Sequence, residues 1–180
     1  RIVGDIEFNG APFIDRLSFR DPDHVIAEWS DKRFLIGIGQ ASVTPLPDIP
    51  VQARNARTIN IPERVKRESG DIDFAVGDRS STAIAIASHG HLAIWDAATG
   101  ARLAQIPDAG YIRAAAFSPD GRCLLAGYDE RSAALWLWRS SDLRDQACAR
   151  LTRNLSRDEW AHWFPKQRYR PICADLPPAN

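Results

Sequence analysis

The sequence lacks several features that would define a function class at once. It has no methionine, only three cysteines, and no apolar run that approaches the length of about 18 residues expected of a membrane span. Neither sign of charge dominates, since 23 lysines and arginines balance 23 aspartates and glutamates. A balanced chain has no global field that draws it to nucleic acid or to a membrane. With no signal-peptide pattern and no starting methionine, we expect a cytoplasmic protein and a fragment of a longer chain.

Motifs that carry chemistry are missing as well. There is no G-x-S-x-G segment, no phosphate-binding glycine loop and no dinucleotide fingerprint. The four histidines form no H-E-x-x-H pattern, and the His89-Gly90-His91 segment is more typical of a turn between strands than of a metal site. We therefore expect this segment to be no enzyme and to use no cofactor or metal ion.

The three cysteines are Cys123, Cys148 and Cys173. An odd number, widely spaced and without a C-x-x-C pair, argues against both a zinc site and a disulfide framework. We expect Cys123 to be a small core residue of a strand. Cys148 and Cys173 flank the C-terminal tail and could approach each other, but we interpret them as packed, reduced thiols.

What the sequence does contain is a series of short apolar runs bounded by turn residues. Between residues 82 and 138 the runs are four to seven residues long, too short for free-standing helices. Thr99-Gly100 and Pro119-Asp120-Gly121 are turn signals between them. Such spacing indicates an all-β meander.

The meander repeats. Phe117 precedes Trp138 by 21 residues, and Phe74 precedes Trp95 by the same number, so the two pairs are offset by 43 residues. A period in the low forties with four strands per unit is typical of a propeller blade. We predict complete blades at about 11–61 and 71–106, a last blade from 111, and strands at 13–19, 24–29 and 34–38 in the first of them. Its outer strand is expected at 58–61, after a proline-rich loop at 41–56, and 63–69 is expected to be a charged connector.

The repeat resembles the WD-repeat β-propellers. The resemblance rests on Trp95-Asp96, on Thr99-Gly100 and on the segment from Phe117 to Arg122 that reads F-S-P-D-G-R. It implies an all-β fold of about three blades over residues 1–141, followed by a short C-terminal α-helical cap over 142–180. The residues expected to hold the blades together are Trp95, Asp96, Phe117, Pro119, Asp120, Gly121 and Trp138, with Trp95 and Trp138 packing blade against blade.

The N-terminal segment, residues 1–8, alternates like a strand. We interpret it as the outer strand of a preceding blade, which leaves the last blade without a fourth strand and places the donor upstream of Arg1. Members of this family usually need about seven blades. We therefore expect the remaining blades to come from upstream polypeptide or another chain, and the isolated chain to aggregate or dimerise through bare apolar faces at both ends of the arc.

The spacing of apolar residues changes in the C-terminal tail, residues 142–180. Apolar residues at four-residue spacing predict a helix over about 142–153, and Ser156 with Glu159 forms a capping box that begins a second one. We expect Trp160 and Trp163 to pack this tail against the outside of the last blade. The tail resembles the C-terminal cap of bacterial WD-repeat proteins, in which the propeller follows a switch ATPase, a caspase-like or trypsin-like protease, or a kinase.

These patterns favour a non-catalytic protein-recognition or sensor module of a larger bacterial signalling or defence protein, with a protein or peptide as partner. One alternative is a propeller enzyme with a central-channel site, although the expected channel lining, Ala75 and Ala114 to Ala116, is small and apolar. Another is a scaffold that binds nucleic acid through a basic loop. The residues of this loop, which could instead contact an acidic partner or be simply solvated, are Arg54, Arg57, Arg64, Lys66 and Arg67.

Overall fold

The computed structural model describes residues 2–7, 14–29, 32–38, 43–47, 59–106, 110–128 and 132–177. The chain divides into two compact units, Arg1–Trp138 and Arg139–Asn180. Each unit is described by itself. Among the described residues, no helix has both the length and the apolar character needed to cross a membrane.

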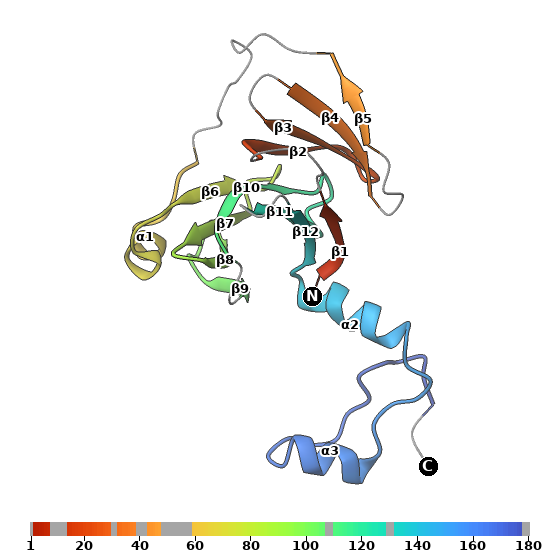
Figure 1. The fold of residues 1–180 in the computed structure, drawn as a ribbon. Helices are drawn as coiled ribbons and strands as arrows, with labels where there is room; N and C mark the ends of the chain where they lie inside the picture. The colour runs from red at the N-terminus through yellow and green to blue at the C-terminus, as the bar shows by residue number, and fades with distance from the viewer. Residues whose placement is uncertain are drawn as a thin grey trace. The chain divides into compact units, whose positions relative to one another are not determined.

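Three antiparallel sheets of four strands make up the first unit (Figure 1). The prediction of a mostly β fold is thus confirmed. The β2 sheet consists of β2 (Arg16–Asp21), β3 (His24–Trp29), β4 (Lys32–Gly37) and β5 (Val43–Leu46). The β6 sheet consists of β6 (Phe74–Gly77), β7 (Ala83–Ser88), β8 (His91–Asp96) and β9 (Arg102–Ile106). The β10 sheet consists of β10 (Ile112–Phe117), β11 (Cys123–Tyr128), β12 (Ser132–Leu137) and β1 (Ile2–Glu7).

The place of β1 corrects the sequence prediction. This strand pairs antiparallel with β12, with Asp5 opposite Ala134, and so gives the last sheet its fourth strand (Figure 1). It is therefore wrong that residues 1–8 belong to a preceding blade, and wrong that the fourth strand must come from upstream of Arg1. The alternation in the sequence identified a strand, but a strand's partner is decided by tertiary pairing that a local pattern does not contain.

The segment between the first two sheets also differs from the prediction. The outer strand is β5 rather than residues 58–61, and it includes Pro45 opposite Phe34. A proline is tolerated there because β5 is an edge strand, whose outer N–H groups have no ladder to join. The predicted charged connector is a helix, α1 (Glu63–Ser69), which buries Val65 completely.

The β10 sheet has apolar clusters on both of its faces. On one face Leu125 and Leu135 pack with Leu17, Val25 and Ile36 of the β2 sheet. The second cluster joins the other face to the β6 sheet, and its largest members are Leu92, Ile94, Ile106, Phe117, Leu124 and Trp138. The innermost strand β10 accordingly contacts both β2 and β6.

The two predicted blade-packing tryptophans have different roles. Trp138 lies between two sheets as expected, with its ring edge-on to Phe117 at 6.0 Å. Trp95 does not lie between two sheets. It belongs to a third cluster, on the far face of the β6 sheet, where it packs with Ile84 and with Val65 of α1. A helix covers this tryptophan where we had expected a neighbouring blade.

The expected bare apolar faces are not found in the described part of the first unit. On the β6 sheet the far face is covered by α1 together with Ile59 and Ile61. On the β2 sheet, Leu17 and Val25 face the β10 sheet, so the alternate positions face away. These carry the ion pair between Arg33 and Glu28, 3.0 Å apart, beside Ile26 and Leu35, which are half-buried. The large apolar side chains that are exposed here, Leu103 and Tyr111, lie in β9 and just before β10.

The second unit contains α2 (Ser140–Cys148) and α3 (Arg157–Trp163). The predicted helix over 142–153 ends five residues early, at Cys148. The reduced thiols expected at Cys148 and Cys173 are wrong, because these residues form a disulfide. The capping box is confirmed: Ser156 Oγ accepts from the N–H of Glu159, and the Glu159 carboxylate accepts from the N–H of Ser156.

The side chain of Asn154 organises the rest of this unit. It is buried and makes four hydrogen bonds to the returning tail. Its amide nitrogen donates to the carbonyls of Cys173 and Leu176, and its oxygen accepts from the N–H groups of Ile172 and Cys173. One polar side chain and one disulfide therefore fix the tail to the helical part.

Trp160 is part of this local core. It is 3% exposed, its ring lies tilted against Phe164 and edge-on to Tyr169, and its indole N–H donates a hydrogen bond to the carbonyl of Gln167. These contacts all lie within the C-terminal unit. Trp163, for which the same docking was expected, is 69% exposed. The prediction that these two tryptophans pack the tail against the last blade stays a prediction.

Candidate functional site

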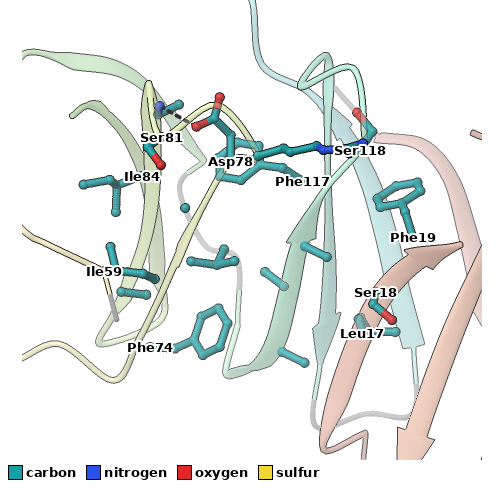
Figure 2. Close-up of a pocket in the computed structure, with 18 of the residues that line it drawn as sticks. Leu17, Ser18, Phe19, Ile59, Phe74, Asp78, Ser81, Ile84, Phe117 and Ser118 are labelled. Carbon is teal, nitrogen blue, oxygen red and sulfur yellow. Dashed lines mark hydrogen bonds between the residues drawn. The ribbon is translucent and has the colours of Figure 1, made fainter. Parts of the chain in front are cut away.

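A hollow lies along the innermost strands of the three sheets (Figure 2). Its volume is about 790 Å³, which is in the range of ligand-binding clefts. Three stretches of consecutive residues line it: 15–20 at β2, 74–79 at β6 and 114–119 at β10. Each of these strands is at the edge of its sheet, since it pairs with one neighbour only. The backbone edge of each of these three strands, which has no partner strand, therefore lies along the hollow.

The inner wall of the hollow is small and apolar. Ala75, Ala114, Ala115 and Ala116 all line it, as the sequence predicted for the inner strands. Larger side chains border these alanines: Figure 2 shows Phe19 on one side, Phe74 on the other and Phe117 between them. Such a lining offers shape and apolar contact rather than groups for proton transfer.

Two buried polar residues in the lining hold turns. Asp78 accepts hydrogen bonds from the N–H groups of Thr82 and Ala83 and from the Thr82 hydroxyl. Ser118 donates from its hydroxyl to the Asp120 carboxylate, which lowers the pKa of Asp120, and it accepts from the N–H of Cys123. Because both side chains are engaged in their own turns, we assign them a structural role.

The exposed charges of the lining are mostly positive. Arg16, Arg20 and Arg79 contribute to it, against the carboxylates of Asp15 and Asp78. None of the three arginines forms an ion pair with another described residue. An arginine with no carboxylate partner beside a hollow can donate to an incoming anion, and it can do so through two parallel N–H groups.

The predicted basic loop is only partly within the described residues. Arg54 and Arg57 lie outside them. On α1, Arg64 donates to Glu68 at 2.8 Å and Lys66 donates to Glu63 at 2.6 Å. The hydrogen bond from Lys66 and its charge lower the pKa of Glu63. Arg67 lies on the same helix and is exposed. Helix α1 therefore carries glutamates beside its basic residues. The prediction of a positive cluster did not take these glutamates into account.

The turn residues of the WD-like motif lie where the sequence placed them. The Asp96 carboxylate accepts from the N–H groups of Ala98 and Thr99 and from the Thr99 hydroxyl, and these bonds lower its pKa. After it, Gly100 has φ 66°, in the left-handed region. These contacts build a turn and leave no free group for chemistry.

The second motif turn carries Pro119, Asp120 and Gly121. The Asp120 carboxylate accepts from the N–H of Arg122, and Gly121 has φ 67°. The Gly121 carbonyl accepts from the indole N–H of Trp138. His89 and His91 flank Gly90 at the turn between β7 and β8, as expected, and the described residues contain no group of three metal-ligating side chains.

The arginines of the hollow are the functional candidates that sequence reasoning missed. Arg16 and Arg20 lie on β2, the first strand of its sheet. A basic residue on a strand that was expected to line a channel was a signal that the sequence contained. Arg79 stands in the turn after β6, and nothing local connects it to β2. They meet only because β2 and β6 both pack on β10.

Comparison with known proteins leaves the family open. The sequence matches no model of a known protein family, and a search of curated proteins finds no match either.

Proposed function

We propose that this chain is a non-catalytic protein-recognition or sensor module built from WD-repeat-like sheets. The observation that carries the proposal is the hollow of about 790 Å³ at the inner edges of three rigid sheets. A rigid scaffold that presents a preformed concave site is the usual basis of recognition. The enzyme alternative receives less support, because the buried polar residues in the lining, Asp78 and Ser118, hold turns and the inner wall consists of alanines.

The WD-repeat resemblance gains support from the topology. Each sheet contains four antiparallel strands, and the last is completed by the N-terminal segment of the chain. In closed propellers of this family the N-terminal segment often supplies that strand. We therefore propose that the three sheets are propeller-like blades, with the β10 sheet, the last in the chain, packed between the β2 and β6 sheets. A larger bacterial signalling or defence protein, with an enzymatic domain upstream, is part of the same proposal.

The nucleic-acid alternative is not favoured by any observation. Arg64 and Lys66 of the proposed basic loop are paired with acids of their own helix. The formal net charge of the chain is zero. A binder of the phosphate backbone needs a basic surface, which these residues do not form.

The disulfide bears on the cellular location of the protein. The sequence favours the cytoplasm, where thiols are kept reduced, whereas the Cys148–Cys173 bridge favours an oxidising compartment. We propose the oxidising compartment. Alkylation of acid-quenched protein from the producing cells tests this: one labelled cysteine supports the proposal, and three labelled cysteines would return the protein to the cytoplasm.

The recognition function is tested with the whole chain and a library of random 12-residue peptides displayed on phage. We expect a family of related peptides that bind saturably with one site per chain. The matched control is Asn60→Trp, which places a large ring at an exposed position of the lining and should abolish the enrichment. If no peptide family emerges, or if the same peptides bind the Asn60→Trp variant equally well, the proposal fails.

A further inference from the structure

We infer that the hollow recognises an acidic peptide segment in extended conformation. The inference rests on the proposed recognition function and names the partner's chemistry. Its first support is the backbone. β2 and β6 are edge strands, and the stretches 15–20 and 74–79, which include most of β2 and all of β6, line the hollow. An unpaired strand edge is a template to which an extended peptide can add as a further strand.

The second support is charge. Arg16, Arg20 and Arg79 are exposed and have no ion-pair partner among the described residues. Of the two carboxylates in the lining, Asp78 is buried and already accepts three hydrogen bonds from Thr82 and Ala83. The exposed part of the lining therefore carries three guanidinium groups against the single carboxylate of Asp15, a balance that is complementary to glutamate or aspartate side chains.

The positions of the arginines suit an extended ligand rather than a small anion. Arg16 and Arg20 are four residues apart on β2, which corresponds to about 13 Å along a strand. A shift in the pairing of β2 with β3 leaves Arg20 with no opposite residue. Arg79 stands on the other side of the hollow, in the turn after β6. A single inorganic anion cannot reach both Arg16 and Arg20, whereas a strand with acids on alternate residues can.

The apolar wall distinguishes a peptide from a nucleic acid. Alternate side chains of an extended peptide point to opposite sides. When the acidic side chains point toward the arginines, the side chains between them face the alanines and Phe74. A single-stranded nucleic acid would need exposed aromatic rings for stacking. The aromatic rings in the lining, Phe19, Phe74 and Phe117, are half-buried or buried.

The test uses the whole chain and fluorescein-labelled 12-residue peptides in which glutamate alternates with valine, titrated by fluorescence anisotropy. Peptides with glutamine or lysine in place of glutamate serve as controls. We expect the glutamate peptide to bind at least about tenfold more tightly than the glutamine peptide, because hydrogen bonds to charged groups are the stronger ones. Raising the salt concentration should weaken only the glutamate peptide.

Variants locate the binding. Arg20→Ala and Arg79→Ala should each weaken the glutamate peptide about tenfold, and all three arginines are exposed, so the variants should fold. Lys32→Ala is the matched control, since Lys32 is exposed on β4 of the same sheet and does not line the hollow. It should change binding less than twofold.

Several outcomes would overturn the inference. Equal affinity for the glutamate and glutamine peptides would do so, as would binding that Arg20→Ala and Arg79→Ala leave unchanged. Tighter binding of a 12-nucleotide single-stranded DNA than of the glutamate peptide would point to nucleic acid instead. If the phage library yields peptides without acids, the recognition function stands and the acidic partner is refuted; if it yields none, both fail.

Discussion

At the scale of single residues, aspartates hold the turns of the first unit. Asp78, Asp96 and Asp120 each accept N–H groups from residues that follow them in their turn. This local bonding is why Asp and Gly recur in turns, and why the turns at Asp96 and Asp120 were visible in the sequence. Arg16, Arg20 and Arg79 were not visible in this way, because their meeting depends on the packing of whole strands.

Glu159 gives a pH-dependent prediction. The guanidinium of Arg153 and the N–H of Ser156 donate to its carboxylate and lower its pKa from 4.5 to about 2. Because the pKa is lower in the folded state, the stabilisation is complete above pH 4.5 and is lost as the pH falls toward 2. Urea unfolding at a series of pH values, followed by tryptophan fluorescence, should show this loss.

The matched variants are Glu159→Gln and Asp158→Asn. Glu159→Gln should flatten the dependence between pH 4.5 and 2, whereas Asp158→Asn should retain it, because Asp158 is in the same first turn of α3 but does not pair with Arg153. Equal slopes for the two variants would contradict this account.

Trp160 tests the local core of the second unit. Its buried ring packs between Phe164 and Tyr169, so Trp160→Ala should lower the free energy of unfolding by about 3 kcal/mol or more. Trp163→Ala should change it by less than about 0.5 kcal/mol, because Trp163 is exposed. Denaturant unfolding followed by circular dichroism measures both. Similar values for the two would show that Trp160 is not a core residue.

At the scale of elements, sequence patterns predicted some strands well and others not at all. The strand β3 has the predicted bounds, since its apolar run follows an Asp21-Pro22-Asp23 turn signal. The strand β5 was missed because prolines argue for a loop, and only its edge position makes Pro45 acceptable. Helix α1 was missed because seven mostly charged residues carry almost no apolar period, and its single buried residue is Val65.

The repeat itself was also read with an error. Phe74 begins β6, whereas Phe117 ends β10, so these two residues are not equivalent. The corresponding strands β7 and β11 begin at Ala83 and Cys123, which are 40 residues apart rather than 43. The period still identified the meander, because any spacing near forty residues accommodates four short strands and their turns.

The strand β1 gives the prediction at this scale. Removing residues 1–8 should leave the backbone edge of β12 unpaired, which lowers the thermal midpoint and promotes self-association. A synthetic peptide of residues 1–8 should restore the midpoint when added to the shortened chain, and a scrambled peptide should not. Differential scanning fluorimetry measures this. An unchanged midpoint after the deletion would mean that β1 does not complete the sheet.

At the scale of the first unit, the chain covers its own sheets. The β10 sheet packs on both of its neighbours, and α1 covers the far face of the β6 sheet. The far face of the β2 sheet carries the ion pair of Arg33 and Glu28 beside the half-buried Ile26 and Leu35. The sequence could not predict this coverage. It depends on α1 and β1, one of which was read as a connector and the other assigned to the wrong sheet.

The central claim is therefore that three complete sheets, covered by the chain's own elements, form the scaffold on which the hollow depends. Size-exclusion chromatography with light scattering on the whole chain tests it most directly. We predict a single species of 20.0 kDa that does not bind a hydrophobic dye. A dimer, or aggregates that bind the dye, would show that apolar sheet faces are exposed and that the scaffold needs another polypeptide.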